Sequence, residues 1–242
     1  RIVTNDELAA RIETSDEWIR ARTGITTRRI QCEGKAMSDL GIEAGRGALE
    51  KSGFDPESID LVLVATMTPD TFMPATACRV ANALGCTKAG ALDINIACSG
   101  FLYGVMTSAA QIGSGKARRV LCIGGDTLSR ITNWDDRRTA VLFGDAAGAA
   151  VLTAEGDGQL LGWDYGADGK SAESLFIKAG PGRPSQEPND YKVEMDGQAV
   201  FRFATSAMTK SSERALSMAG LTLADVDLIV PHQANRRILE MA

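Results

Sequence analysis

The chain has 242 residues, of which 44% are hydrophobic and 24% are charged, and its net charge is −5. These values are typical of globular proteins with one large domain or two smaller ones. The acidic balance argues against a general nucleic-acid surface. No apolar run reaches the roughly 20 residues that span a membrane, and the N-terminal residues do not form a signal peptide.

The cysteine pattern limits the possible metal and disulfide chemistry. The five cysteines are irregularly spaced and include no CxxC pair: Cys32, Cys78, Cys86, Cys98 and Cys122. Because there is no CxxC pair and only one histidine, a zinc site is not expected. A disulfide scaffold is not expected in a chain of this size, so a reducing cytoplasm is the predicted location. The chain opens directly into helix-like sequence, so we expect it to begin inside a longer protein.

Helices and buried strands alternate along the first part of the chain. A capping box at Thr14 and Glu17 and a stop at Gly24 predict the first helix. The following candidates are helix 38–52 with a stop at Gly53, strand 61–65, helix 74–84, strand 91–96, a helix of about fifteen residues after Gly100, and strand 120–123. This alternation predicts an α/β fold with a mainly parallel sheet.

The second part of the chain is less regular. Its predicted elements are a turn leading into a buried strand within 143–152, a hairpin-like return at 159–165, a loop at 170–198, and a long helix at 199–218.

An internal similarity links the two parts. Residues 47–63 align with residues 214–230 at a constant offset. The matching pairs are Ala48 and Ala215, Leu49 and Leu216, Gly53 and Gly220, Asp60 and Asp227, and Leu61 and Leu228. One explanation is chance similarity between two helix–loop–strand units. The other is a duplicated α/β fold whose halves, residues 1–155 and 156–242, meet near residue 155.

Cys98 is the candidate nucleophile. It lies between a predicted strand and a predicted helix, where the helix N-terminus favours negative charge and lowers the pKa of a thiol. Its small neighbours Ala97, Ser99 and Gly100 allow a sharp turn. A buried, inert cysteine remains the alternative, and it is the expected state of the other four.

His232 is the second candidate catalytic residue. It follows the apolar run Leu228–Pro231, so we expect it at the carboxyl end of a buried strand, where sites in open α/β sheets collect. There a neutral imidazole can stabilise a developing negative charge. A structural or merely exposed histidine is the alternative.

Four motifs occur in the order found in one family. They are Thr14–Ile19 with Arg22–Ile25, Asp93–Phe101, Phe143–Ala149 and Pro231–Asn235. Together the motifs make the chain resemble β-ketoacyl-acyl-carrier-protein synthase III over essentially its whole length. The resemblance implies a thiolase-like layered fold with two similar α/β halves, mainly parallel mixed sheets and a homodimeric assembly.

The resemblance also implies an activity, with no cofactor and no metal. Cys98 accepts an acyl group from acyl-coenzyme A, malonyl-acyl-carrier protein loses carbon dioxide, and its enolate attacks the Cys98 thioester while His232 stabilises the enolate. The positions implied in coenzyme A binding are Trp18, Arg22, Thr23, Arg137, Gln198, Phe201, Ala234 and Asn235. Trp18 and Arg137 are expected to sandwich the adenine. Arg237 is implied in binding the acidic carrier protein.

Three positions depart from the family pattern. Arg138 replaces a familiar glycine and Gln198 an asparagine, so we expect modestly altered coenzyme A binding. Met73 replaces a large aromatic residue that reaches across the dimer, which suggests a roomier acyl pocket. The asparagine of the family's Gly-Asn-Thr-Ser loop is expected downstream of Ala242, so we expect residues 1–242 alone to condense poorly.

Two other functions remain open at this point. One is a thiolase-fold enzyme of secondary metabolism, such as a polyketide- or quinolone-type synthase or an acyltransferase for another acceptor. The other is a non-catalytic interaction module that keeps the fold without the reaction. The Cys98 motif does not separate the first from a priming synthase, whereas the Pro231–Asn235 motif favours the synthase.

Overall fold

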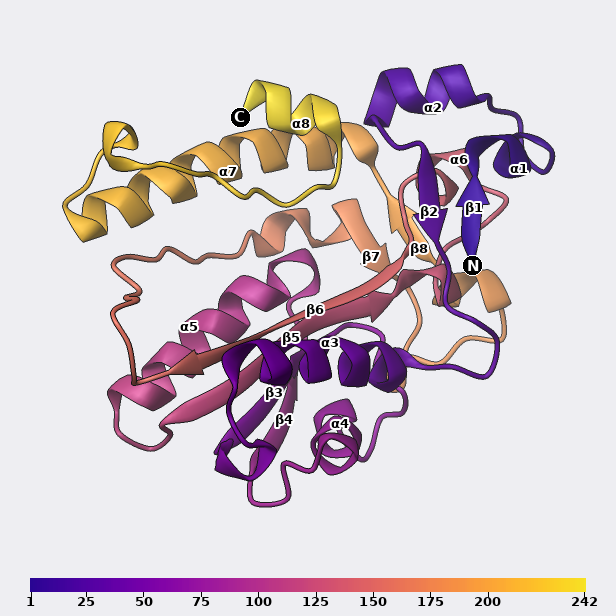
Figure 1. Ribbon diagram of the computed structural model, residues 1–242. Helices are drawn as coiled ribbons and strands as arrows, with labels where there is room; N and C mark the ends of the chain where they lie inside the picture. The colour runs from indigo at the N-terminus through magenta and orange to yellow at the C-terminus, as the bar shows by residue number, and fades with distance from the viewer. The chain divides into compact units, whose positions relative to one another are not determined.

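The computed structural model describes residues 1–242 and shows two compact units (Figure 1). Unit 1 consists of residues 1–30, 128–144 and 161–242, and unit 2 of residues 31–127 and 145–160. The predicted halves 1–155 and 156–242 rest on internal similarity rather than on compactness, and they stay a prediction. None of the helices is long and apolar enough to cross a membrane.

Unit 2 is built on a four-stranded mixed sheet. Its strands, in spatial order, are β4 (Gly90–Ile94), β3 (Leu61–Ala65), β5 (Arg119–Thr127) and β6 (Asp145–Thr153). β3 pairs in parallel with β4 and β5, whereas β6 is antiparallel to β5. The sheet confirms the predicted α/β class. β5 extends the predicted strand 120–123 at both ends, and β6 follows the predicted turn and ends one residue later than predicted.

Helices cover both faces of this sheet. α3 (Met37–Ser52) and α4 (Thr76–Leu84) pack on one face, and α5 (Gly100–Gly113) packs on the other (Figure 1). The side chains alternate accordingly: Val62, Val64, Leu121 and Ile123 join the α3 and α4 core, while Leu63, Val120 and Cys122 face α5. A strand buried on both faces is apolar throughout, which explains why the sequence predicted β3 correctly.

Glycines let α5 approach the sheet closely. A Cβ atom on Gly100 would lie 2.9 Å from Cβ of Ala65, and one on Gly104 would lie 2.6 Å from Sγ of Cys122. One turn further, Ser108 is fully buried, and its hydroxyl donates to the Gly104 carbonyl at 2.7 Å. α5 begins two residues after Cys98. Its position on the sheet therefore depends on glycines, because any larger residue at Gly100 or Gly104 would push the helix away.

We expect the change Gly104→Ala to destabilise the protein. Overpacking a core costs about 1–3 kcal/mol, and the gain in helix propensity from glycine to alanine, about 1 kcal/mol, offsets only part of it. Urea unfolding should show a lower midpoint. Gly113→Ala is the matched control on the same helix, because a Cβ atom there meets nothing within 4 Å. An unchanged midpoint for Gly104→Ala would contradict the close packing.

Unit 1 contains short strands and most of the remaining helices. Two antiparallel pairs are present, β1 (Ile2–Thr4) with β2 (Thr27–Arg29) and β7 (Leu175–Ile177) with β8 (Val193–Met195). The helices are α1 (Asn5–Ala9), α2 (Asp16–Thr23), α6 (Arg137–Ala140), α7 (Gly197–Ala219) and α8 (Arg236–Met241). Its apolar core joins Val3, Leu8, Ile19 and Val141.

Some predicted boundaries and elements in unit 1 were wrong. α2 begins one residue later than predicted. Its N-cap is Ser15 rather than Thr14, because the Ser15 hydroxyl accepts from the Trp18 backbone N–H at 3.1 Å. Residues 159–165 form no strand. Instead, the carboxylate of Asp164 accepts hydrogen bonds from Ser211 and Arg214 of α7, contacts that no local pattern indicates. The predicted loop 170–198 contains β7, β8 and two 3₁₀ turns.

The internal similarity has a structural counterpart up to its last segment. α3 and α7 both end before a left-handed glycine, Gly53 and Gly220, each with φ of 70°. A 3₁₀ turn follows in both copies, at Pro56–Ser58 and Leu223–Asp225. β3 comes next in the first copy, but Leu228–Val230 form no strand and are exposed. The strand predicted there was wrong, because these residues pair with no neighbouring strand.

Candidate active site

Cys98 lies where the sequence placed it, between a strand and a helix. It is the middle residue of the 3₁₀ turn Ala97–Ser99, which follows β4 and leads into α5. Ala97 has φ of 43°, in the left-handed region that costs a non-glycine residue roughly 1–2 kcal/mol. Local strain next to a nucleophile is typical of functional sites, since the surrounding fold must impose it. The Cys98 residue itself is exposed.

The pKa of Cys98 differs from the expectation. Although the residue is exposed, the protein around its thiol disfavours the thiolate by desolvation and raises the pKa; the Asp126 carboxylate raises it further. A hydrogen bond from the Cys98 backbone N–H acts in the opposite direction but is smaller. The predicted lowering by the helix N-terminus was therefore wrong for the resting state, and the thiol is predominantly protonated at neutral pH.

Asp126 is a residue near Cys98 that the sequence analysis did not select. It lies near the end of β5, and its Oδ1 accepts from the backbone N–H groups of Met67 and Thr68 at 2.8 and 3.1 Å. The hydroxyls of Thr66 and Thr68 donate to the same atom at 2.8 and 2.9 Å. Desolvation raises the pKa of Asp126, while these hydrogen bonds lower it. Asp126 thus holds the loop after β3 and places a carboxylate near Cys98.

Replacing Asp126 with asparagine should make Cys98 more reactive. The amide oxygen can still accept hydrogen bonds from the loop, but the charge that disfavours the thiolate is gone. We expect iodoacetamide to alkylate Cys98 roughly threefold faster at neutral pH, a modest effect because water screens the charge. Peptide mass spectrometry can follow Cys98 and the exposed Cys78 in one sample, with Cys78 as the internal reference. Equal or slower alkylation of Cys98 would contradict the electrostatic effect.

His232 lies in a coil segment of unit 1, not at the end of a strand as predicted. It is exposed and precedes α8, whose N-cap is Asn235. Desolvation by the surrounding protein nevertheless lowers the pKa of His232 below its usual value of 6.5. Its imidazole is therefore mostly neutral at pH 7, with one ring N–H that can donate a hydrogen bond and one ring nitrogen that can accept one.

An aromatic and cationic surface forms around Trp18. The guanidinium carbon of Arg22 lies 5.0 Å from the Trp18 ring centroid, and that of Arg137 lies 5.1 Å from it, both within cation–π range. Arg137 also donates to the Glu13 carbonyl at 3.1 Å. A base sandwiched between Trp18 and Arg137 needs about 7 Å, two van der Waals contacts, so Arg137 must move outward to admit it.

The other predicted binding residues also belong to unit 1. The Thr23 hydroxyl is buried and engaged in the helix end, donating to Ile19 O at 2.7 Å and accepting from Ile25 N at 3.0 Å. Exposed or half-buried positions hold the rest: Gln198, Phe201, Ala234, Asn235 and Arg237. α8 contacts the end of α2, since a Cβ atom on Gly24 would lie 3.1 Å from Cβ of Arg236. Unit 1 thus holds His232 and every predicted binding residue, while unit 2 holds Cys98.

The chain has clear relatives. A profile of the family described as 3-oxoacyl-[acyl-carrier-protein (ACP)] synthase III matches residues 92–169, which include the Cys98 turn. The β-ketoacyl-[acyl-carrier-protein] synthase III of Laribacter hongkongensis is 48% identical over 239 residues, covering 99% of this chain and 75% of that protein. The chain belongs to the 3-oxoacyl-[acyl-carrier-protein] synthase III family. As a member of this synthase III family it is an acyltransferase, which confirms the predicted enzyme class.

Solved structures agree with the family assignment. The synthase III of Aquifex aeolicus VF5 superimposes with a TM-score of 0.93 at 38% identity, covering 100% of this chain and 75% of that one. The priming β-ketosynthase of the R1128 polyketide pathway gives 0.92 at 36% identity, covering 100% and 73%. These matches confirm the thiolase-like fold that the resemblance implied.

Arg138 and Met73, two of the residues that differ from the synthase III pattern, have distinct surroundings in the structure. Arg138 forms two hydrogen bonds from Nε to the carboxylate of Asp136, both at 3.0 Å, so its charge is engaged within its own turn. Met73 is 83% exposed beside Phe72, which is 81% exposed, in the loop before α4. The roles of Arg138 in coenzyme A binding and of Met73 in the acyl pocket stay predictions.

Proposed function

We propose that this synthase III carries out two steps on Cys98. In the first step, the Cys98 thiolate attacks the carbonyl carbon of an acyl-coenzyme A, and the coenzyme A thiolate leaves and takes a proton. In the second step, malonyl-acyl-carrier protein loses carbon dioxide, and the resulting enolate carbon attacks the Cys98 thioester. The Cys98 thiolate is released, and the product is 3-oxoacyl-acyl-carrier protein.

One observation carries this proposal: the strained turn at Ala97 presents Cys98 at the start of α5 in a chain of this family. A backbone N–H at this turn can bind the oxyanion that forms on the thioester carbonyl. The raised pKa of the thiol leaves little thiolate at neutral pH, so Cys98 must lose its proton before it attacks the acyl-coenzyme A carbonyl. His232, neutral at pH 7, supplies the hydrogen bond to the enolate oxygen.

The Trp18 surface is the proposed site for the nucleotide end of acyl-coenzyme A. An indole ring with two guanidiniums within 5.1 Å suits an aromatic base that carries phosphate groups. Thr23 is proposed to help Trp18 and Arg22 hold this nucleotide end. Four further residues are proposed to line the path of the pantetheine arm: Gln198, Phe201, Ala234 and Asn235. The exposed Arg237 is proposed to meet the acidic carrier protein. Neither a cofactor nor a metal takes part, since thioester exchange and enolate stabilisation need only the groups named.

Mass spectrometry of the intact chain tests the two steps separately. Acetyl-coenzyme A should add one acetyl group, and malonyl-acyl-carrier protein should then remove it, slowly for residues 1–242 alone, and appear as 3-oxoacyl-acyl-carrier protein. An adduct that an alcohol or amine acceptor removes, without condensation, would point to an acyltransferase for another acceptor. Absence of an adduct with acetyl-, branched- and long-chain acyl-coenzyme A alike would sink the proposal.

Priming of a polyketide pathway is the second candidate. The 36% identity and TM-score of 0.92 to the R1128 priming β-ketosynthase support it. The two candidates share the chemistry at Cys98 and differ in the carrier protein that accepts the acyl unit. Competition between a fatty-acid and a polyketide carrier protein, both loaded with malonyl, decides between them by the ratio of the two products.

Location and assembly are part of the same proposal. The enzyme acts in the cytoplasm, which agrees with its five free cysteines in a compartment that keeps thiols reduced. It forms a homodimer, and the exposed Phe72 and Met73 are apolar side chains of the kind that an interface covers. Light scattering of wild type and Met73→Lys checks the second point, since a charge in the interface should favour the monomer.

A further inference from the structure

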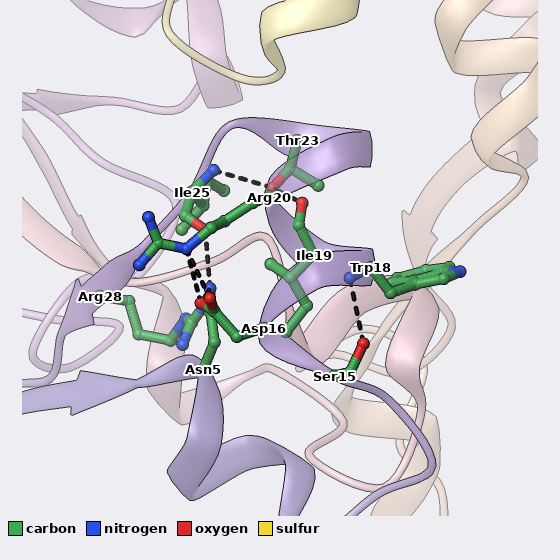
Figure 2. A network of polar contacts seen from close by, with 9 residues as sticks. All are labelled: Asn5, Ser15, Asp16, Trp18, Ile19, Arg20, Thr23, Ile25 and Arg28. Atoms are coloured by element: carbon green, nitrogen blue, oxygen red, sulfur yellow. Dashed lines mark hydrogen bonds and ion pairs between the residues drawn. The ribbon is translucent and has the colours of Figure 1, made fainter.

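A buried polar network lies beneath α2 in unit 1 (Figure 2). Its central residues, Asn5 and Arg28, are only 1% and 5% exposed. The Asn5 side-chain amide donates to Oδ1 of Asp16 and to the Ile25 carbonyl, both at 2.8 Å. Arg28 donates from Nη2 to Oδ1 of Asn5 at 2.7 Å. One side chain thus uses both its amide hydrogens and its carbonyl oxygen within the network.

The network ties both ends of α2 to the same residue. Asp16 is the first residue of α2, and Ile25 comes two residues after its last, Thr23. α2 has eight residues, too few for a stable helix on its own, and Ile19 is its fully buried apolar side chain. The tilt and rotation of α2 therefore depend on the hydrogen bonds of Asn5 as well as on the packing of Ile19.

Arg28 fixes Asn5 in turn. Its guanidinium donates to the carbonyls of Thr4 and Val141 at 3.3 Å in addition to Asn5, and no carboxylate contacts it. Burial lowers the pKa of Arg28 because the charge is removed from water. A buried cation surrounded by carbonyl oxygens holds those acceptors strongly, since losing one of them leaves charge uncompensated. The Asn5 amide therefore keeps one orientation, with its oxygen toward Arg28 and its nitrogen toward α2.

We infer that Asn5, oriented by Arg28, is a positioning residue for acyl-coenzyme A: it holds α2 so that Trp18 and Arg22 meet Arg137 in one nucleotide-binding surface. The inference rests on the proposed function of the Trp18 surface. Trp18 and Arg22 lie on α2, whereas Arg137 begins α6, so a rotation of α2 separates the indole from the Arg137 guanidinium. Asn5 touches no part of the surface itself and acts through the helix.

The change Asn5→Asp separates this role from general stability. The aspartate keeps an oxygen for Arg28, now with a favourable charge, but it offers no hydrogen to Ile25 and repels Asp16. A second variant, Asp16→Ala, removes the carboxylate that accepts from the Asn5 amide and leaves the hydrogen bond from Arg28 to Asn5 in place. Asp164→Ala is the matched control, because it breaks the hydrogen bonds to Arg214 and Ser211 in the same unit without touching α2.

Steady-state kinetics with acetyl-coenzyme A and with acetyl-pantetheine, which lacks the nucleotide, tests the inference. For Asn5→Asp and Asp16→Ala we expect KM for acetyl-coenzyme A to rise about tenfold with kcat nearly unchanged, because a small misplacement weakens binding geometry. KM for acetyl-pantetheine should stay at the wild-type value, as should both KM values of Asp164→Ala.

The outcomes separate the inference from the function on which it rests. If both thioesters lose activity in parallel in both variants, or if neither KM changes, Asn5 is a structural residue only and the inference is overturned. If wild type itself does not prefer acetyl-coenzyme A over acetyl-pantetheine, the proposed nucleotide surface fails, and the inference fails with it. A preference lost in Asn5→Asp and Asp16→Ala but kept in Asp164→Ala supports the inference.

Discussion

Replacing Cys98 with alanine is expected to abolish acyl transfer from acyl-coenzyme A. The alanine side chain cannot form a thioester, so the acyl adduct on the intact chain should disappear and condensation should fall by about 10³-fold or more. The fold should persist, because Cys98 is exposed and its turn is set by Ala97 and by the packing of Gly100 on Ala65. Intact mass and thermal unfolding of the same sample check both statements.

A matched control exists in the same unit. Cys78 is also exposed, in α4, so Cys78→Ala removes a thiol of similar accessibility without touching the Cys98 turn. Its acyl adduct should match that of wild type. If Cys98→Ala still takes up one acyl group, the nucleophile is a different residue, and the roles assigned around Cys98 are wrong.

Replacing His232 with alanine is expected to separate the two half-reactions. Acylation of Cys98 should continue, whereas condensation with malonyl-acyl-carrier protein should fall by about 10²–10³-fold, the usual cost of removing one donor to a developing oxyanion. His232→Gln should retain part of the rate, because its side-chain amide can still donate a hydrogen bond. Quantifying the acyl adduct and the 3-oxoacyl product in one reaction measures both steps.

The pH profile gives an independent measurement of His232. Desolvation lowers its pKa below 6.5, so the neutral form persists to lower pH than in a free histidine. For enzyme already acylated on Cys98, condensation should hold constant from neutral pH downward and decline only as pH falls through this lowered pKa. Gln233→Ala, the exposed neighbour, is the control and should keep the profile. Loss of acylation in His232→Ala, or an unchanged acid limb in that variant, would contradict the assigned role.

Local rules were sufficient for several elements of the fold. Gly53 and Gly220 end α3 and α7 because a left-handed residue is needed there and glycine adopts that conformation without a clash. β3 was correctly bounded because a strand covered on both faces is apolar at every position. The turn at Cys98 was found for a similar reason, since small residues between a strand and a helix indicate a sharp connection.

Local rules failed where distant residues decide the outcome. Leu228–Val230 match β3 in composition, but a strand requires a partner strand, and these residues have none. The segment 159–165 alternates like a strand, yet Asp164 pairs with Arg214 fifty residues away. The predicted sign of the Cys98 pKa shift was wrong because desolvation by the surrounding protein, followed by the Asp126 carboxylate of β5, outweighs the hydrogen bond from the Cys98 backbone N–H.

The sequence by itself determined the family, the α/β class, and Cys98 and His232 as the candidate reacting groups, because motifs and hydrophobic periodicity are local properties of the chain. The tertiary structure alone decided the positioning of the site. Asn5, Arg28 and Asp126 belong to no motif, and their importance lies in hydrogen bonds to residues 11 to 113 positions away. Such contacts are chosen by the packing of the whole unit, since a buried polar group must find its partner wherever the fold provides one.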